Sequence, residues 1–368
     1  MRILLNGSYA PSLIGFRGPL IRMLCDRGDE VHVSAPDIAG DVRAELERYG
    51  ATVHEVPLSR TGTSVAGDIG YFLALRRLMR RIAPDFVLGY TIKPNIWGSL
   101  AARSLSIRSA SMVTGLGYAF AEPAGAAGRL LSGLSRRLYR LATNANARVI
   151  FQNPDDLADF AAAGCLADPA KAGIVNGSGV DLAHYAPAPL PSDAVFLLIG
   201  RFLGAKGVRE YAQAAASLLA RHPEWRFQLV GFPDEGPDGI PAAELTAIEA
   251  SGVEFLGRQD DVRPAIREAS VFVLPSYREG TPRSVLEAMA MGRPIVTTDA
   301  PGCRETVTGG VNGRLVPVGD AEALASAMEE LGSSRALRQA MGAESVRIAR
   351  EKYAVEQVNT SLVRLLGI

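Results

Sequence analysis

Short apolar runs of strand length alternate with longer amphipathic stretches along the whole sequence. This alternation constrains the fold more than any other feature, because it is typical of repeated strand–helix units that build a parallel sheet. In the first half we expect strands at 2–6, 31–35, 52–56, 86–90, 110–113 and 149–152. The second half repeats the pattern, with strands expected at 195–200, 227–231, 253–256, 271–274, 294–297 and 313–316. The predicted fold class is α/β, with two parallel sheets in tandem.

A proline-rich segment separates the two halves. The residues Ala186–Ser192 include three prolines, each of which removes a backbone donor and fixes φ. We therefore expect an N-terminal domain at 1–185, a C-terminal domain at 186–354, and a helix at 355–368 that crosses back to the N-terminal domain. Open parallel sheets bind ligands beyond the carboxyl ends of their strands. The two sets of strand ends are expected to face an interdomain cleft that closes about the proline-rich segment.

Composition excludes several classes of protein. The sequence has 39 basic and 39 acidic residues, so it lacks the basic excess on which nucleic-acid binding rests. Its three cysteines and four histidines are scattered without metal-ligand spacing, so no metal is expected. No run approaches the roughly 20 apolar residues of a membrane-spanning helix, and the N-terminus does not resemble a secretory leader. We expect a cytoplasmic protein.

The loop Gly200–Gly207, with the sequence GRFLGAKG, follows one predicted strand and opens a helix. Glycines let backbone amides approach a ligand, and a helix N-terminus carries about half a positive charge. Arg201 and Lys206 add two full charges, so we interpret this loop as a diphosphate site. The alternative is an ordinary glycine-bearing turn with two solvated cations. The loop matches neither the Walker order nor G-x-G-x-x-G, which argues against a dinucleotide dehydrogenase.

Two glutamates follow the strand expected at 271–274. Glu279 lies in a loop, and Glu287 lies eight positions later within the next predicted helix. Ionised carboxylates accept hydrogen bonds, so each could hold the hydroxyls of a sugar or a ribose. A charged helix face is the alternative explanation for the pair.

These motifs resemble those of the retaining nucleotide-sugar glycosyltransferases of family 4, which have the GT-B architecture of two facing Rossmann-like domains. Glu279 and Glu287 form the E-x7-E pattern, LPSYREGTPRSVLEAMAMGRPIV is similar to the family signature, and GRFLGAKG resembles its diphosphate loop. The resemblance implies a UDP-sugar as donor substrate, no cofactor and no metal. It also implies catalytic roles for Glu279, Arg201 and Lys206. The donor-binding set that it implies is Gly200, Arg201, Lys206, Arg258, Glu279, Gly280, Thr281, Pro282, Ser284, Val285 and Glu287.

Motifs of the first half resemble those of bacterial family members that extend saccharides on undecaprenyl diphosphate. They lie at Ile14–Pro19, Ile92–Gly98 and Thr114–Tyr118. The resemblance implies a polyprenyl-diphosphate-linked saccharide as acceptor and an N-acetylhexosamine such as GalNAc as the transferred sugar. The sequence lacks the histidine that many members carry near the donor sugar, where Thr114 and Gly115 stand instead. The implied acceptor-side residues are Gly15, Phe16, Arg17, Lys93, Asn95, Thr114 and Gly115.

A predicted helix at 128–142 suggests contact with an anionic membrane. Leu130, Leu134, Leu138 and Leu141 share one face by their spacing, and Arg129, Arg136 and Arg140 gather on an adjoining flank. Between Tyr71 and Arg148, twelve basic residues stand against two acidic ones. Such a helix can lie in an anionic interface, so we expect a peripheral protein on the inner face of the cytoplasmic membrane. The alternative is a core-packed helix with a solvated basic flank.

The implied reaction is retaining sugar transfer, with the departing nucleoside diphosphate stabilised by Arg201, Lys206 and the helix dipole. Two other functions are compatible with the same sequence plan. One is a nucleotide-sugar 2-epimerase or hydrolase. The other is a non-catalytic scaffold that binds nucleotides or carbohydrates.

Overall fold

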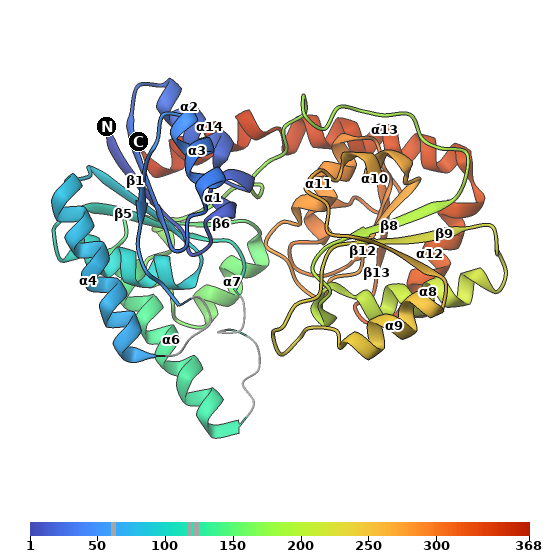
Figure 1. Cartoon of the computed structure of the whole chain (residues 1–368), viewed down its shortest axis with the longest axis horizontal. Helices are drawn as coiled ribbons and strands as arrows, with labels where there is room; N and C mark the ends of the chain where they lie inside the picture. The colour runs from blue at the N-terminus through green and yellow to red at the C-terminus, as the bar shows by residue number, and fades with distance from the viewer. Residues whose placement is uncertain (60–63, 117–119, 121–124) are drawn as a thin grey trace. The chain divides into compact units, whose positions relative to one another are not determined.

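The computed structural model describes residues 1–59, 64–116, 120 and 125–368, and for residues 125–131 it describes the backbone alone. These residues form two compact units (Figure 1). Unit 1 comprises Met1–Ser178 and Val358–Ile368, and unit 2 comprises Gly179–Gln357.

Unit 1 is built on a parallel sheet of seven strands in the order β3-β2-β1-β4-β5-β6-β7. Six of them coincide with the expected runs to within two residues at each end, and β7 is a short addition that the apolar pattern does not predict. The order reverses between β1 and β4, so the carboxyl ends of these strands form the topological switch point of the sheet. The strands are β1 (Arg2–Asn6), β2 (Glu30–Ala35), β3 (Thr52–Glu55), β4 (Phe86–Tyr90), β5 (Arg108–Val113), β6 (Arg148–Phe151) and β7 (Ala172–Ile174).

Helices cover both faces of this sheet. Alternate residues of β1 enter different apolar clusters: Ile3 and Leu5 pack with α1, α2, α3 and α14, whereas Leu4 packs with α4 and α5. A third cluster joins α6, α7 and the π-helical turn η1. The bounds are α1 (Pro11–Gly15), α2 (Gly18–Asp26), α3 (Gly40–Arg48), α4 (Val65–Ile82), η1 (Pro94–Gly98), α5 (Ser99–Arg103), α6 (Gly125–Ala145), α7 (Pro154–Ala162), η3 (Pro169–Lys171) and α14 (Val355–Leu366).

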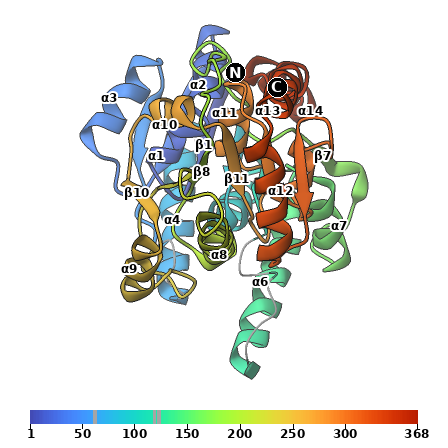
Figure 2. The same cartoon turned by 90° about the vertical axis from the view of Figure 1, so that its right-hand side faces the viewer.

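Helix α6 contains the helix expected at 128–142, and its amino-terminal half projects beyond the other helices of unit 1 (Figures 1 and 2). Leu138 packs on the cluster around Tyr139, while Leu134 and Leu141 are about half exposed, at 49% and 50%. The side chains of Arg129 and Leu130 lie outside the described residues. Core packing therefore accounts for Leu138 and leaves Leu134 and Leu141 facing solvent.

Unit 2 contains a parallel sheet of six strands in the order β10-β9-β8-β11-β12-β13, so its switch point lies between β8 and β11. Helices α8 and α12 lie side by side, as do α11 and α13 (Figure 2). The strands are β8 (Val195–Ile199), β9 (Arg226–Val230), β10 (Val253–Gly257), β11 (Val271–Leu274), β12 (Ile295–Thr298) and β13 (Gly313–Val316). The helices are η4 (Gly204–Lys206), α8 (Val208–Leu219), α9 (Ala242–Ala250), α10 (Arg263–Glu268), α11 (Arg283–Ala290), η5 (Arg304–Thr306), α12 (Ala321–Ser333) and α13 (Arg335–Lys352).

The proline-rich segment belongs to unit 2 and does not connect the units. Two buried arginines hold it by its carbonyls: Arg293 donates to Ala188 O and Pro189 O at 3.1 Å, and Arg338 donates to Ser192 O at 2.8 Å. The chain instead passes between the units at 178–179 and at 357–358. The division thus falls a few residues before the expected boundary at 185–186. The segment Ala186–Ser192, about which closure is expected, therefore lies inside unit 2.

The C-terminal helix α14 ends in unit 1. Leu362, Val363 and Leu366 are buried there among residues of β1, β2 and α2. Arg148 donates to Leu365 O at 3.1 Å, and Arg27 donates to Ile368 O at 3.1 Å. The last eleven residues therefore complete the core of the unit that the first residues begin.

Candidate active site

The loop Gly200–Gly207, which we term the phosphate loop, lies at the switch point of unit 2. It leaves the carboxyl end of β8, forms the turn η4 and opens α8. Gly207 has a φ of +70°, and a Cβ there would lie 2.2 Å from the carbonyl oxygen of Pro275. Only glycine fits this contact with the loop after β11. The two loops at the switch point are therefore packed against each other.

Lys206 and Glu279 meet across these two loops as an ion pair. Their side chains are largely buried, with exposures of 23% and 13%, and Ser276 Oγ also donates to Glu279 Oε1 at 2.8 Å. Glu279 is anchored through its amide, which donates to Pro301 O at 2.9 Å. The structure thus brings together two of the residues that the sequence predicts to be catalytic.

Arg201, the other expected cation, is paired with a residue that the sequence motifs do not include. Its Nη1 lies 2.7 Å from Asp234 Oδ2, and its side chain is 51% exposed. The guanidinium of Arg258 lies over the Phe232 ring, 5.4 Å from its centre. Both arginines therefore lie against the loop after β9.

Glu287 lies in the second turn of α11 and is 7% exposed. Arg283, one turn earlier, donates to its Oε1 at 2.8 Å. Burial raises the pKa of the Glu287 carboxyl, and the Arg283 guanidinium and the Tyr185 hydroxyl oppose that rise. A buried carboxylate with one cationic partner still has acceptor positions for the hydroxyls of a ligand.

The remaining expected donor residues surround the start of α11. Ser284 Oγ donates to Ile199 O at 3.2 Å, which ties this helix to the end of β8. Gly280, Pro282 and Val285 are buried, so a ligand would meet them mainly through backbone atoms, and Thr281 is half-buried. A Cβ added at Gly200 would make only ordinary van der Waals contacts, at 3.9–4.0 Å. In the segment 260–262, which follows Arg258 in the sequence, hydrogen bonds from Arg263 lower the pKa of Asp261 to about 2.

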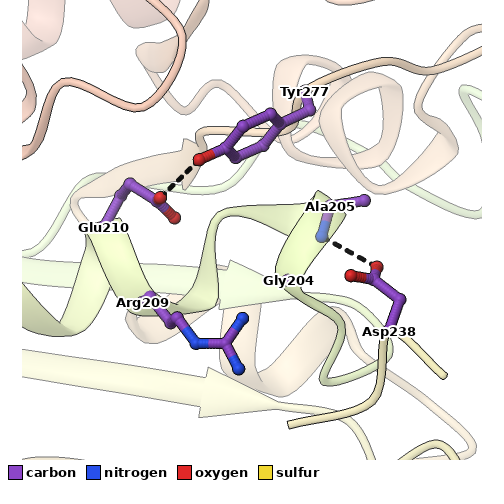
Figure 3. Close-up of a pocket in the computed structure, with 6 residues that line it drawn as sticks. All are labelled: Gly204, Ala205, Arg209, Glu210, Asp238 and Tyr277. Atoms are coloured by element: carbon purple, nitrogen blue, oxygen red, sulfur yellow. Dashed lines mark hydrogen bonds between the residues drawn. The ribbon is translucent and has the colours of Figure 1, made fainter. Parts of the chain in front are cut away.

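A cavity of about 320 Å³ lies beside the phosphate loop (Figure 3). Tyr277 donates to Glu210 Oε1 at 2.6 Å across it, and Ala205 N donates to Asp238 Oδ2 at 2.9 Å. Its described lining consists of Gly204, Ala205, Arg209, Glu210, Asp238 and Tyr277. This lining contains none of the residues expected to bind the donor.

The expected acceptor-side residues lie near the carboxyl ends of β1, β4 and β5. Phe16 is 47% exposed, while Arg17 is 3% exposed and lies over the Tyr90 ring, 5.2 Å from its centre. Gly15 ends α1, and the half-buried Thr114 and Gly115 follow β5. Phe16 is thus the one exposed member of the expected acceptor-side set, while Gly15, Thr114 and Gly115 are half-buried.

Two other acceptor-side candidates are engaged within unit 1. Lys93 Nζ pairs with Asp68 Oδ1 at 2.7 Å. Asn95 is fully buried and donates to Met112 O at 2.9 Å, so its side chain braces β5. Gly117 and Tyr118 of the predicted motif Thr114–Tyr118 lie outside the described residues.

A hydroxyl pair that the sequence did not reveal lies at the switch point of unit 1. Ser8 Oγ and Thr91 Oγ1 are 2.8 Å apart, at the ends of β1 and β4. Thr91 has a φ of +70°, which is unusual for a β-branched residue. The only signal in the sequence is that both residues lie just after predicted strands.

Two family models match the chain. A model described as "Glycosyl transferase 4-like domain" matches residues 18–175, and one described as "Glycosyl transferases group 1" matches residues 193–334. The chain is a glycosyltransferase with one domain of each of these two families. This finding confirms the family that the sequence motifs predict.

Among relatives, the glycosyltransferase is similar to the N,N'-diacetylbacillosaminyl-diphospho-undecaprenol alpha-1,3-N-acetylgalactosaminyltransferase of Campylobacter jejuni. The two are 29% identical over 353 residues, which cover 92% of this chain and 91% of that protein. The D-inositol 3-phosphate glycosyltransferase of Kribbella flavida is 34% identical over 204 residues, covering 50% of this chain and 48% of that protein. The first likeness extends over nearly the whole length of both proteins.

Solved structures of low identity share the fold of this glycosyltransferase. Anabaena HepE in complex with UDP has a TM-score of 0.77 at 19% identity, with 100% of both chains covered. Sucrose-phosphate synthase from Thermosynechococcus elongatus has a TM-score of 0.81 at 17% identity, with 99% of this chain and 98% of that chain covered. The predicted fold class, GT-B with two Rossmann-like parallel-sheet domains, is confirmed.

Two further properties concern the described part of the glycosyltransferase. Within it, no group of three or more His, Cys, Asp or Glu side chains is arranged to hold a metal ion. In the same residues, every helix is too short or too polar to span a lipid bilayer.

Proposed function

We propose that this glycosyltransferase moves a sugar from a UDP-sugar to a saccharide linked to polyprenyl diphosphate, with retention of the anomeric configuration. The observation that carries the proposal is the pair of cations, Arg201 and Lys206, on a glycine-bearing loop at the switch point of unit 2. Oriented cations and a helix N-terminus suit a diphosphate. The solved complexes of Anabaena HepE with UDP and with UDP-glucose support UDP as the nucleotide.

The donor is held by four groups of residues in this proposal. Arg201 and Lys206 bind the diphosphate, Glu287 accepts hydrogen bonds from the ribose, and Arg258 lies at the base. Glu279 faces the transferred sugar together with the backbone of 280–282. The carboxylate oxygens of Glu279 and Glu287 support these roles, because ionised carboxylates accept hydrogen bonds from hydroxyls.

The acceptor is an undecaprenyl-diphosphate-linked saccharide, and the transferred sugar is an N-acetylhexosamine such as GalNAc. The name of the Campylobacter jejuni relative supports both parts, because that protein is an N-acetylgalactosaminyltransferase acting on a diphospho-undecaprenol saccharide. On the acceptor side, Phe16, Thr114 and Gly115 offer contacts at the carboxyl edge of the first sheet.

The reaction proceeds by attack on the face of the sugar that the diphosphate leaves. The bond between the anomeric carbon and the diphosphate oxygen breaks, and the acceptor hydroxyl forms the new bond at the same carbon. Its proton passes to the departing diphosphate. Arg201, Lys206 and the α8 N-terminus stabilise the negative charge that develops there, so the transfer needs no metal.

The enzyme acts in the cytoplasm as a peripheral protein on the anionic inner face of the membrane. The exposed Leu134 and Leu141 of α6 support this part of the proposal, since half-exposed leucines beside arginines suit an anionic interface. Each nearby cation contributes about 1 kcal/mol to such binding.

The test is a screen of radiolabelled UDP-sugars with synthetic undecaprenyl-diphosphate-linked N,N'-diacetylbacillosamine. We expect label to move from one UDP-sugar to the lipid, and NMR of the product to show the donor's anomeric configuration. Fast turnover of the sugar nucleotide without acceptor would instead favour an epimerase or hydrolase. Binding without turnover, unaffected by replacing Arg201, Lys206 and Glu279, would favour a scaffold.

A further inference from the structure

The segment Phe232–Ile240, between β9 and α9, carries three acidic residues, and we term it the acidic loop. The backbone of the acidic loop is hydrogen-bonded to the phosphate loop near both of its ends. Phe202 N donates to Phe232 O and Ile240 N donates to Phe202 O, each at 3.0 Å, and Gly204 N donates to Asp238 O at 2.9 Å. The acidic residues are therefore held against the expected diphosphate site by main-chain bonds.

Asp234, the third residue of this loop, is held by two contacts. Its Oδ1 accepts a hydrogen bond from Gly236 N at 2.8 Å, while Oδ2 faces Arg201 Nη1 at 2.7 Å. A Cβ at Gly239 would lie 1.8 Å from Asp234 O, so the loop can close only over glycine. The carboxylate is thus positioned by its own turn, and it is the longer, half-exposed Arg201 that can swing away.

A second carboxylate of the acidic loop occupies a backbone donor of the phosphate loop. Asp238 Oδ2 accepts from Ala205 N at 2.9 Å, as Figure 3 shows. Anionic oxygens therefore lie on both a guanidinium and an amide of the phosphate loop. These are the two kinds of donor that bind the oxygens of a diphosphate.

We propose that Asp234 competes with the nucleoside diphosphate for Arg201, and so weakens the binding of product and speeds its release. This inference rests on the proposed function, in which Arg201 binds the diphosphate. Binding of the donor exchanges the Asp234 carboxylate for phosphate oxygens on Arg201, and departure of the product restores the pair. Release of product limits the turnover of many enzymes, so such a competitor has a use.

Breaking the Lys206–Glu279 pair and breaking the Arg201–Asp234 pair have different consequences for donor binding. When a diphosphate displaces Glu279 from Lys206, that carboxylate can turn to the hydroxyls of the transferred sugar. Asp234 has no such role in the proposed reaction, so its pairing with Arg201 only opposes donor binding. The alternative is that Asp234 positions Arg201 for the diphosphate. The two ideas predict opposite signs for the same substitution.

The experiment measures UDP binding to the full-length chain by calorimetry and UDP dissociation by stopped flow, for wild type and Asp234→Asn. Asparagine keeps an oxygen for Gly236 N and removes the charge. We expect the UDP Kd of Asp234→Asn to fall about two- to fivefold, because that change corresponds to the free energy of an exposed ion pair. UDP should also dissociate more slowly from this variant. The control is Glu254→Gln, which removes the same charge from the exposed Arg226–Glu254 pair at the amino end of β9 and should leave the Kd unchanged.

Arg201→Ala and the double variant Arg201→Ala/Asp234→Asn complete the test. Competition requires that Asp234→Asn has almost no effect once Arg201 is absent. The inference is overturned if Asp234→Asn tightens UDP binding equally with and without Arg201. It is also overturned if Asp234→Asn alone leaves the UDP Kd unchanged or raises it. If wild type fails to bind UDP, or Arg201→Ala binds it as wild type does, the proposed function of this site fails instead.

Discussion

Lys206 and Glu279 form an ion pair between the loops that leave β8 and β11, the two strands at which the order of the second sheet reverses. They lie 73 positions apart in the sequence. The parallel topology brings them together, because both loops leave the same edge of the sheet at neighbouring strands.

Substitutions of Lys206 and of Glu279 should have different effects, the first on nucleotide binding and the second on sugar transfer. We expect Lys206→Met to weaken UDP binding by about 10- to 100-fold, since a hydrogen bond to a charged group contributes about 1.5–3 kcal/mol. Glu279→Gln should bind UDP at least as tightly as wild type but lose turnover. Calorimetry and a transfer assay measure the two effects, and unfolding curves establish that each variant is folded. Wild-type affinity in Lys206→Met would contradict the assignment.

Glu287 should favour function at the expense of stability at neutral pH. Because burial raises its pKa in the fold, its contribution to the free energy of unfolding is fully present at acidic pH. That contribution is lost as pH rises through the folded pKa. We therefore expect the thermal stability of Glu287→Gln relative to wild type to increase as the pH rises from acidic to neutral, while its UDP affinity falls about tenfold.

Glu330→Gln is the matched control of opposite sign. The Arg314 guanidinium lowers the pKa of Glu330, so this carboxylate contributes stability above its unfolded pKa. That stability disappears on acidification through the folded pKa. Glu330→Gln should be less stable than wild type at neutral pH, and the difference should shrink in acid. The account of Glu287 fails if both variants show the same pH trend.

The exposed leucines of α6 should govern membrane binding without affecting the fold. We expect Leu134→Ser/Leu141→Ser to reduce sedimentation with anionic vesicles at low salt, because less apolar surface enters the interface. Each substitution should change stability by no more than about 0.5 kcal/mol, as is usual at exposed sites. Leu73→Ser on α4 is the control, since Leu73 is also 50% exposed. Equal sedimentation of all three proteins would contradict a role for α6 in membrane binding.

Arg293 should be important for the stability of unit 2. Arg293→Met leaves the carbonyls of Ala188 and Pro189 without their buried donor, so we expect a loss of about 1–3 kcal/mol in the free energy of unfolding. The exposed Arg347, which pairs with Glu344 and Glu351, provides the comparison. Arg347→Met should lose less than about 1 kcal/mol. Denaturant titration measures both, and similar losses would contradict the attachment of the proline-rich segment.

Sugar transfer should persist without divalent ions. In the proposed mechanism, Arg201, Lys206 and the α8 N-terminus compensate the charge of the leaving diphosphate. Transfer rates are therefore expected to be the same with EDTA and with added magnesium. A rate abolished by the chelator and restored by a divalent cation would rule out this mechanism.

The strands could be predicted because their apolar runs are buried on both faces, as in β4, where all five residues are buried. The three-residue β7, Ala-Gly-Ile, has no such run, and pairing with β6 alone defines it. The loops at the second switch point could be predicted because their glycines and charges are local. The Arg201–Asp234 pair could not be predicted, since Asp234 lies 33 positions from Arg201 on another loop. The division between the units differs from the expected boundary at 185–186 because Arg293 and Arg338, which are distant in sequence, hold the proline-rich segment in unit 2.

The most direct test of the proposed donor site is a crystal structure of the protein with UDP. It should place diphosphate oxygens within hydrogen-bond distance of Lys206 Nζ and the Arg201 guanidinium, with the Lys206–Glu279 and Arg201–Asp234 pairs both broken. A nucleotide bound elsewhere, with both pairs intact, would contradict the assignment of these cations to the diphosphate.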